Sequence, residues 1–463
     1  MGKMKEFDSL YFVGAGGIGM AALERYFLAQ GKRIAGYDRT PSDLTAALQQ
    51  EGVHIDFDED PRLIPDYCRD PERTLVVYTP AVPDTHKGLS YFREAGFEVV
   101  KRAALLGVVT ASSKGLCFAG THGKTTTSSM AAHILHDSGI GCNAFLGGVL
   151  RNYNSNFLLS ATSPYSVIEA DEFDRSFHHL HPYVAVVTST DPDHLDIYGT
   201  AENYLEGFAH FTELIQPGGS LIVHTGLALQ PRVPDGVTTY TYSRDQGDFH
   251  AAHIRKGGGE ISFDLITPWE TVADISLGVP VDINIENAIA AMAACRLIDV
   301  PVEAMRKAIA SFMGPKRRFE FWIKEPGDHG KVMIDDYAHH PGELRASIAS
   351  VRDLYPGRRL TVIFQPHLYT RTRDFAPEFA SALSLADEVI LLPIYPAREQ
   401  PIPGVTSEMV LNQVTSTKKC IYSKENLIKS IELSNFDVLL TAGAGDIANL
   451  LPQICLEFKK QKH

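Results

Sequence analysis

Residues Gly115 to Met130 read GLCFAGTHGKTTTSSM. The apolar run Leu116–Ala119 predicts a buried strand, and the stretch SSMAAHIL after the threonines is compatible with a helix. The glycine turn between them is typical of a phosphate loop, in which backbone N–H groups surround phosphate oxygens and the helix start adds partial positive charge. The loop residues are Gly120, Thr121, His122, Gly123, Lys124, Thr125 and Thr126. This segment therefore predicts a strand, a nucleotide-binding loop and a helix.

Lys124 and Thr125 carry the chemistry expected of such a loop. We expect the ammonium of Lys124 to reach the β- and γ-phosphates of a nucleotide and the hydroxyl of Thr125 to bind Mg²⁺. The full eight-residue pattern has a glycine at position 118, where this chain has Phe118, so only GxxGKT is present. The strand and the helix on either side favour nucleotide binding over a chance match.

The composition excludes several other classes of protein. A chain of 463 residues predicts two to four domains. Its net charge of −13 argues against a surface for nucleic acid or anionic membranes. The six cysteines show no CxxC spacing, which argues against a disulfide framework or a thiolate zinc site. We see no signal peptide and no apolar run of membrane-spanning length, so we expect a cytoplasmic protein without membrane insertion.

The N-terminal stretch resembles a dinucleotide fingerprint. The predicted strand Leu10–Val13 leads into a glycine loop and a helical run to Ala29, and the next predicted strand, Arg33–Tyr37, ends at Asp38. The loop residues are Gly14, Ala15, Gly16, Gly17, Ile18 and Gly19. In such a loop the glycines admit a pyrophosphate and the acid takes a ribose hydroxyl, although a tight turn without a ligand has the same pattern. A further strand, Leu75–Tyr78, leads into Thr79, Pro80 and Ala81.

Polar residues also follow the predicted strands after the phosphate loop. Strand Tyr165–Ile168 precedes Glu169, an acid that either holds Mg²⁺ or belongs to a solvated acidic turn. Strand Val184–Val187 precedes the loop that carries His194, which either contacts a metal or phosphate or has a structural role. Gly147-Gly148 reads as a loop, and 238–279 reads as short strands with glycine turns. Asn284 and Asn287 open a helical run. Asn284 either caps that helix or reads an adenine edge.

A third α/β region follows Lys316, Arg317 and Arg318, which form either a solvated face or a phosphoryl-stabilising group. The polar stretch Lys324–Lys331 is the best linker candidate. Four predicted strands then each lead into a cluster of polar residues: Val332–Ile334, Leu360–Phe364, Val389–Leu392 and Val438–Leu440. The clusters begin at Asp335-Asp336, Gln365, Pro393 and Thr441. Since open α/β sheets bind ligands at the carboxyl ends of their strands, we expect chemistry there.

Nine motifs in a fixed order are similar to those of the Mur ligase family, and the resemblance covers essentially the whole chain. They read GAGGIGM, GTHGKTTT, EADE, DHLD, PKRRFE, DDYAHHP, FQPH with YTRT, IYPAREQPIPGV and TAGAGDI. The resemblance implies an α/β fold of three domains. These are a Rossmann-like N-terminal domain that binds a UDP-sugar, a P-loop-type central ATPase with a mixed sheet, and a Rossmann-like C-terminal ligase domain. We expect them at residues 1–112, 113–323 and 324–463.

The resemblance also implies a reaction in peptidoglycan precursor synthesis. ATP with Mg²⁺ would activate the lactyl carboxylate of UDP-N-acetylmuramate as an acyl phosphate, and the amine of L-alanine would attack it through a tetrahedral intermediate. Closing of the domains would hold the amine in place and exclude water. The glycine loop Gly14–Gly19 would then grip the diphosphate of the sugar nucleotide instead of NAD.

Roles for single residues follow from the resemblance. The UDP-sugar would be bound by Gly14, Ala15, Gly16, Gly17, Ile18, Gly19, Asp38, Thr79, Pro80 and Ala81. ATP would be bound by Gly120, Thr121, His122, Gly123, Lys124, Thr125 and Thr126, with Asn284 and Asn287 on adenine, Asp336 on the ribose and Arg318 near the γ-phosphate. The metal would be held by Thr125, Glu169 and His194. The catalytic residues would be Lys124, His194, Arg318, His339 and Arg371, with His339 and Arg371 contacting the substrate carboxylate and the amino acid.

The chain departs from the family pattern at Ile283, Leu368 and Ser189, where the family often has His, Arg and Asn. Several related ligases hold a second Mg²⁺ with a carbamylated lysine. Because no lysine occurs between Lys124 and Lys256, we expect metal binding without a carbamate.

Three alternatives stay open at this stage. A ligase that adds a tripeptide to the same UDP-sugar has similar motifs. An NAD-dependent dehydrogenase would explain GAGGIG and Asp38 but not the phosphate loop, and an inactive nucleotide-binding regulator would explain neither Lys124 nor Glu169. We expect small-molecule partners and no nucleic acid, and the sequence leaves the choice between monomer and dimer open.

Overall fold

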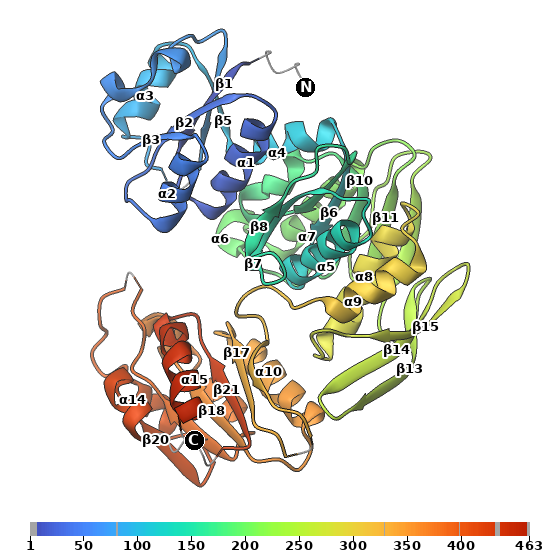
Figure 1. The fold of residues 1–463 in the computed structure, drawn as a ribbon, viewed down its shortest axis with the longest axis vertical. Helices are drawn as coiled ribbons and strands as arrows, with labels where there is room; N and C mark the ends of the chain where they lie inside the picture. Colours follow the sequence, from blue (N-terminus) through green and yellow to red (C-terminus); the bar gives the residue numbers. More distant parts are fainter. Residues whose placement is uncertain (1–6, 80–81, 328, 398, 431–435, 461–463) are drawn as a thin grey trace. The chain divides into compact units, whose positions relative to one another are not determined.

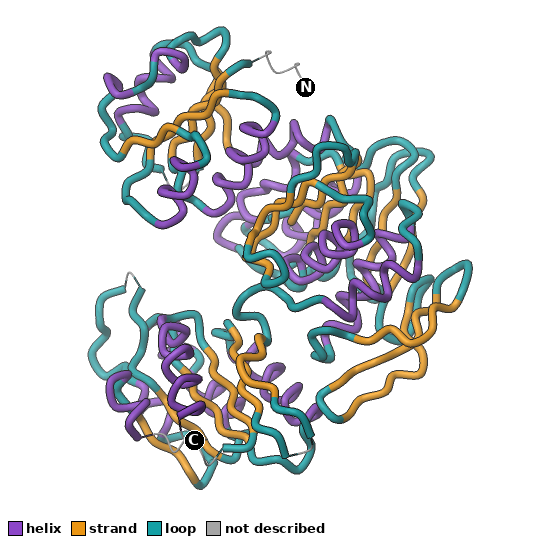
Figure 2. Tube along the Cα trace, viewed as in Figure 1, coloured by secondary structure: helices purple, strands orange, loops and turns teal. Residues whose placement is uncertain are grey.

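The computed structural model describes residues 7–79, 82–327, 329–397, 399–430 and 436–460. Their strands form four sheets, of five, seven, three and six strands (Figure 1). The chain divides into two compact units. The first unit comprises Met1–His250, Ile266–Glu270 and Asn287–Ala308, and the second comprises Ala251–Leu265, Thr271–Glu286 and Ile309–His463. Helices and strands alternate along most of the chain (Figure 2), as the predicted α/β class requires.

The first sheet of unit 1 is parallel and has the strand order β3-β2-β1-β4-β5. Its strands are β1 (Ser9–Val13), β2 (Arg33–Tyr37), β3 (His54–Asp56), β4 (Thr74–Tyr78) and β5 (Glu98–Lys101). The helices are α1 (Ile18–Ala29), α2 (Asp43–Gln50), α3 (Lys87–Glu94) and α4 (Arg102–Ala111), with the short turns η1 (Pro61–Leu63) and η2 (Asp66–Cys68). The predicted N-terminal strands and the helix that ends at Ala29 are confirmed.

The second sheet of unit 1 has the order β12-β11-β10-β6-β9-β7-β8, and β8 runs antiparallel to β7. The strands are β6 (Lys114–Ala119), β7 (Asn143–Leu150), β8 (Ser155–Leu158), β9 (Tyr165–Glu169), β10 (Pro182–Val187), β11 (Ser220–His224) and β12 (Thr238–Tyr242). The helices are α5 (Lys124–Asp137), η3 (Phe173–His179), α6 (Leu195–Tyr198) and α7 (Ala201–Glu213). The prediction of a loop at Gly147-Gly148 is wrong, because both glycines lie inside β7.

These two sheets of unit 1 share one hydrophobic core. Tyr26 on α1 packs edge-on against Phe145 on β7, with ring centroids 5.5 Å apart. Helix α4 packs against η3 so closely that a Cβ at Gly107 would lie 2.3 Å from the carbonyl oxygen of His179. The N-terminal glycine loop and the central sheet therefore face each other across a packed contact within one unit.

Unit 2 holds most of the three-stranded sheet β13-β14-β15 and all of a six-stranded sheet. The strands β13 (His250–Gly257), β14 (Glu260–Ile266) and β15 (Thr271–Ser276) confirm the short strands predicted there. Helices α8 (Ile283–Arg296) and α9 (Val302–Ser311) follow, and each has residues in both units.

The six-stranded sheet has the order β16-β17-β21-β18-β19-β20, and β16 runs antiparallel to β17. Its strands are β16 (Glu320–Lys324), β17 (Val332–Asp336), β18 (Leu360–Phe364), β19 (Glu388–Leu391), β20 (Lys418–Ile421) and β21 (Val438–Ala442). Its helices are α10 (Pro341–Leu354), α11 (Tyr369–Asp374), α12 (Ala376–Leu383), α13 (Ser407–Leu411), α14 (Lys424–Ser430), η5 (Asp446–Leu450) and α15 (Leu451–Lys460). The predicted polar clusters do lie at the carboxyl ends of β17, β18, β19 and β21, which run parallel. Two of these strands are longer than predicted, so that Asp335, Asp336 and Thr441 belong to β17 and β21 themselves.

The predicted linker Lys324–Lys331 is instead the connection between the antiparallel neighbours β16 and β17, with residue 328 outside the description. The segment reads as a linker because both kinds of connection are polar and rich in turn residues. The two predicted boundaries between the three domains stay predictions. No helix within the described ranges combines the length and the apolar composition needed to span a membrane.

The close contact at Gly107 gives a first testable prediction. Replacing a helical glycine by alanine ordinarily stabilises a helix by about 0.5–1 kcal/mol. In Gly107→Ala the new methyl group collides with backbone, so we expect a loss of about 1–3 kcal/mol in unfolding free energy, measured by thermal or urea unfolding. Gly342→Ala is the matched control, since its Cβ would lie 3.7 Å from His340 Nδ1, an ordinary van der Waals contact. Equal or higher stability of Gly107→Ala would contradict this packing.

Candidate active site

The register of the central sheet brings three strand ends to the phosphate loop. Strand β6 pairs in parallel with β9, which places Phe118 beside Glu169, and with β10, which places Ala119 beside Val187. The residues that follow these strands therefore meet at one edge of the sheet. The predicted strand, loop and helix around Lys124 are confirmed.

Two loop glycines have backbone conformations that other residues rarely adopt. Gly120 has φ +140° and Gly123 has φ +84°. A Cβ at Gly120 would lie 2.1 Å from the Thr188 hydroxyl, and one at Gly123 would lie 2.9 Å from the side-chain oxygen of Asn287. The loop is therefore closely surrounded by the β10 strand end and by α8, and glycine is required at both positions.

The ammonium of Lys124 points back into the loop. It donates to the carbonyl of Gly120 at 2.6 Å and forms an ion pair with Glu172, whose two carboxylate oxygens lie 2.8 and 2.9 Å away. The side chains of Lys124 and Glu172 are only 14% and 2% exposed. Glu172 is a residue that the sequence analysis quoted within EADE without giving it a role, because nothing local marks its partner.

Glu169 holds Thr125 at the start of α5. The Thr125 hydroxyl donates to Glu169 at 2.8 Å, and the N–H of Gly147 donates to the other carboxylate oxygen at 2.8 Å. A Cβ at Gly147 would lie 2.4 Å from that oxygen, so β7 needs a glycine there. Burial raises the pKa of Glu169, and the hydrogen bonds from Thr125 and Gly147 oppose this rise.

The rest of the loop is braced from the end of β10. The N–H of His122 donates to Ser189 Oγ at 2.7 Å, and the Thr121 hydroxyl donates to the Asp191 carbonyl at 2.7 Å. Ser189, one of the departures from the family pattern, thus supplies a side-chain acceptor to the loop. Thr126 is the third residue of α5.

His194 lies beside Glu172 rather than beside Glu169. Its Nε2 is 3.9 Å from Glu172 Oε1, and its ring contacts Phe173 edge-on at 5.2 Å. Among the residues that the structure describes, no three His, Cys, Asp or Glu side chains form a ready metal cluster. Of the predicted metal residues, the structure brings Thr125 and Glu169 into contact and places His194 next to the Lys124–Glu172 pair.

The two asparagines that we expect to contact adenine, Asn284 and Asn287, differ in their surroundings. Asn287 accepts a hydrogen bond from Thr127 at 3.1 Å and belongs to the same unit as the phosphate loop. Asn284 belongs to the other unit, lies inside the first turn of α8, and donates to the Val279 carbonyl at 3.1 Å. Ile283, where the family often has His, is exposed.

The N-terminal glycine loop is held by strand β2. Gly14 and Ala15 both donate to the Tyr37 carbonyl, and Gly16 donates to the Asp38 carboxylate at 2.6 Å. Asp38 thus braces the loop itself in this structure. Gly17 is the N-cap residue of α1 and makes no side-chain hydrogen bond there, and Ile18 and Gly19 are the first two residues of that helix. Thr79 lies next to Gly14. Pro80 and Ala81 lie outside the described residues.

A cavity of about 220 Å³ lies between α1, α4, β7 and the end of β9 in unit 1. Its polar side chains are Arg102, Asn156, Glu169, Asp171 and Ser176, and Ile18 and Gly19 also line it. Arg102 is so close to Gly19 that a Cβ there would lie 2.0 Å from the guanidinium. No ion pair or hydrogen bond of the Arg102 side chain is found among the described residues. Arg102 is the first residue of α4 and belongs to no sequence motif, so the sequence alone gives no sign of its place in the cavity.

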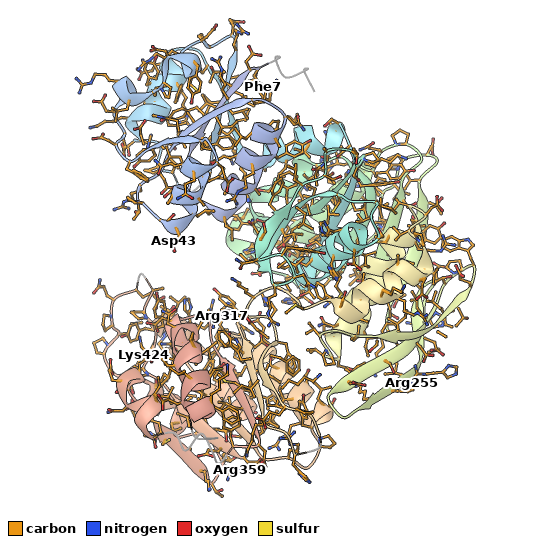
Figure 3. All side chains as sticks on the ribbon, in the orientation of Figure 1. Phe7, Asp43, Arg255, Arg317, Arg359 and Lys424 are labelled. Atoms are coloured by element: carbon orange, nitrogen blue, oxygen red, sulfur yellow. The ribbon has the colours of Figure 1, made fainter. Side chains whose placement is uncertain are left out.

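In unit 2, Arg317 connects the junction before β16 to the six-stranded sheet (Figure 3). Its guanidinium pairs with the fully buried Asp335 at 3.1 Å and donates to the carbonyls of Gly443 and Gly445. Arg317 therefore fits neither of the two interpretations of the basic run, a solvated face or a phosphoryl-stabilising group, because its guanidinium braces the sheet. Arg318 lies over the ring of Tyr337, 5.6 Å from its centroid.

Two carboxyl groups near Arg318 have shifted pKa values. Burial raises the pKa of Asp336 to about 6, although the hydrogen bond from Ser347 and the charge of Arg318 oppose the rise. Glu343 is also desolvated, yet hydrogen bonds from His339 lower its pKa to about 2. Burial therefore dominates at Asp336, while Glu343 is a stable anion that holds His339.

His367 lies between His339 and Arg371 and is close to both. The rings of His339 and His367 lie 6.1 Å apart, and Arg371 Nη1 is 3.5 Å from His367 Nδ1. Leu368, where the family often has Arg, has φ +71° and ψ 136°, a conformation that is costly for a residue with a side chain. The structure thus brings His339, His367 and Arg371 together at the ends of β17 and β18.

Three family models match this chain. Residues 9–114 match "Mur ligase family, catalytic domain", residues 118–295 match "Mur ligase middle domain", and residues 317–445 match "Mur ligase, glutamate ligase domain". Proteins named UDP-N-acetylmuramate–L-alanine ligase are similar along their whole length. The one from Phocaeicola vulgatus is 58% identical over 96% of this chain and 97% of its own, and the one from Parabacteroides distasonis is 56% identical over 99% of each.

Solved structures of two ligases have the same fold as this chain. The UDP-N-acetylmuramate-alanine ligase of Thermotoga maritima is 25% identical and covers 98% of this chain and 99% of its own, with a TM-score of 0.78. A murein peptide ligase of Psychrobacter arcticus is 23% identical over 97% of this chain and 98% of its own, with a TM-score of 0.61, and shows the fold alone. The chain is a three-domain α/β protein that belongs to the Mur ligase family.

Proposed function

We propose that this protein is an ATP-dependent ligase that joins L-alanine to the lactyl carboxylate of UDP-N-acetylmuramate, a step of peptidoglycan precursor synthesis. The observation that carries the proposal is the phosphate loop in which Lys124 and the Thr125–Glu169 pair meet. The 58% identity with a relative of that name supports the choice of substrates.

The chemistry that the site must perform is activation of a carboxylate. A carboxylate resists attack by an amine because it has no good leaving group. Transfer of the γ-phosphoryl group of ATP to a carboxylate oxygen breaks the bond to ADP and forms an acyl phosphate. The amine nitrogen then attacks the acyl carbon, phosphate leaves with the bonding electron pair, and the amine loses a proton to solvent or a nearby base. ADP, phosphate and the amide are the products.

The residues around the phosphate loop suit this chemistry. Lys124 would hold the β- and γ-phosphates, with the loop residues Gly120, Thr121, His122 and Gly123 around them. Mg²⁺ commonly takes one or two protein oxygen ligands besides phosphate oxygens and water. Thr125 and Glu169 are such oxygen donors, 2.8 Å apart and held in place by Gly147, and His194 lies on the neighbouring strand end. A bound Mg²⁺ would neutralise charge on the transferring group.

The remaining predicted residues complete the proposal. The loop Gly14–Gly19 with Thr79 would bind the sugar nucleotide diphosphate, and Asp38 would keep that loop in shape. The cavity that contains Arg102 would take the anionic part of the sugar substrate beside Glu169. Asn284 and Asn287 would contact adenine, Asp336 the ribose, and Arg318 the γ-phosphate. His339 and Arg371 would contact the substrate carboxylate and the amino acid. All partners are small molecules of the cytoplasm.

Phosphate release tests this function directly. Purified protein is supplied with ATP, Mg²⁺ and UDP-N-acetylmuramate, and L-alanine, L-serine, glycine or the tripeptide L-alanyl-γ-D-glutamyl-meso-diaminopimelate is added one at a time. We expect release that needs the UDP-sugar and is fastest with L-alanine. Release with the tripeptide alone would identify a murein-recycling ligase, and no release with any acceptor would refute ligation.

The role of Lys124 predicts a large loss on substitution. Lys124→Met removes the cation that would hold the phosphates, so we expect kcat/KM for ATP to fall about 100-fold or more. Lys114→Met is the matched control, because Lys114 lies at the opposite end of β6 over the ring of Tyr183. If kcat/KM for ATP in Lys124→Met equals that of the control, Lys124 does not hold the phosphates.

The position of Arg102 in the cavity predicts that its substitution weakens binding of the UDP-sugar and not of ATP. Arg102→Met removes an unpaired cation from the cavity, so we expect KM for UDP-N-acetylmuramate to rise about tenfold while KM for ATP and the thermal stability change little. Arg62→Met serves as the control, since the Arg62 side chain is 89% exposed. A rise in both KM values would indicate that Arg102 supports the fold and not the substrate.

The raised pKa of Asp336 predicts a pH-dependent stability. An unfolded aspartate has a pKa near 3.9, so the folded state binds this proton more tightly, and the stabilisation is lost as pH rises through about 6. Asp336→Asn lacks this loss. The unfolding free energy of Asp336→Asn relative to the parent, measured by urea unfolding at each pH, should therefore rise between pH 4 and 7.5, by at most roughly 3 kcal/mol. Parallel curves, such as those we expect for the exposed Asp353→Asn, would contradict the buried setting of Asp336.

A further inference from the structure

Glu172 has the strongest unexplained interaction of the candidate site. Its carboxylate is almost fully buried and faces Lys124 on one side and His194, at 3.9 Å, on the other. A buried carboxylate needs a cation, and a buried ammonium needs an anion, so each side chain satisfies the other while no phosphate is present. The proposed function nevertheless requires Lys124 to serve the phosphates of ATP.

The backbone of Glu172 is held from several sides. The Tyr198 hydroxyl donates to its carbonyl at 2.6 Å, and the next residue, Phe173, packs on the ring of His194. Beyond it, Asp174 and Arg175 both have left-handed φ values, +52° and +54°, and Asp174 pairs with Lys101 at 2.6 Å. Two consecutive left-handed residues without glycine persist only where the surroundings impose them. Because the backbone is held in place, any change of partner by this carboxylate would have to come from rotation of its side chain.

We propose that Glu172 is a positioning residue that binds Lys124 in the absence of nucleotide and exchanges it for the metal when phosphate binds. This inference rests on the proposed function. When ATP phosphates take the ammonium of Lys124, Glu172 is left as a buried anion beside His194. A divalent cation at that place restores the charge balance, either directly or through a water ligand. Nucleotide binding and metal binding are thereby made dependent on each other through one carboxylate.

The exchange makes a specific prediction for metal-free binding. In the parent protein, ATP without metal must displace Glu172 from Lys124 and then lie near an uncompensated carboxylate. Glu172→Gln keeps the shape and removes the charge. We expect this variant to bind ATP in EDTA about fivefold to tenfold more tightly than the parent. The gain in ATP affinity on adding Mg²⁺ should shrink by a similar factor, because the metal loses one charged partner.

Isothermal titration calorimetry of the full chain with ATP, in EDTA and over a series of Mg²⁺ concentrations, tests both effects. Asp193→Asn is the matched control, because Asp193 also lies near His194, at 3.8 Å, but is exposed and does not contact Lys124. The proposal is supported only if Glu172→Gln binds metal-free ATP more tightly and also has the smaller Mg²⁺ gain. Equal weakening in both conditions, an unchanged Mg²⁺ gain or behaviour like that of Asp193→Asn overturns it. Absence of ATP binding by the parent would refute the proposed function instead.

A stability cycle gives an independent readout should Glu172→Gln fold poorly. Thermal unfolding without nucleotide is compared for the parent, Lys124→Met, Glu172→Gln and the double variant. Because each single change leaves a buried partner alone, we expect both to lower Tm and the double variant to recover most of the loss. Additive losses in this cycle would show that the two side chains do not stabilise each other, and would overturn the proposal.

Discussion

The parallel register of three central strands is the constraint on which the rest of the candidate site depends. Pairing of Phe118 with Glu169 and of Ala119 with Val187 brings three loops to one edge of the sheet. A shift of the register by one residue would turn Glu169 to the other face of the sheet, because side chains alternate along a strand. The contact between Glu169 and Thr125 therefore follows from the pairing of buried apolar strands, and not from attraction between the two polar side chains.

Burial then decides what the polar groups at this edge do. Glu172 is almost fully buried, and Glu169 and Lys124 are partly buried, so water compensates their charges poorly and each has a partner in the protein. In unit 2 the same principle separates two neighbouring carboxyl groups. Asp336 has a raised pKa in its buried position, whereas His339 keeps Glu343 ionised. Electrostatic pairing inside each unit thus prepares groups that a charged substrate can engage.

Much of this architecture could be predicted from the sequence because it depends on local patterns. Short apolar runs followed by glycine or polar residues correctly located β1, β2, β6, β9, β10, β18 and β21. The same reasoning failed at Gly147-Gly148, where two glycines suggested a loop. There glycine is needed inside β7 because the carboxylate of Glu169 occupies the space of a side chain. It failed again at Lys324–Lys331, because a hairpin connection and a domain linker have the same polar composition.

The sequence by itself determined the α/β class, the phosphate loop, the order of the motifs and the family, because each of these depends on patterns of residues that are close together along the chain. Only the tertiary structure decided that Glu172 pairs with Lys124, that Arg102 enters a cavity beside Glu169, and that Ser189 braces His122. These partners are 48, 67 and 67 positions apart along the chain. Contacts at that separation depend on how buried surfaces pack and on strand register, and no local pattern of residue types records either of them.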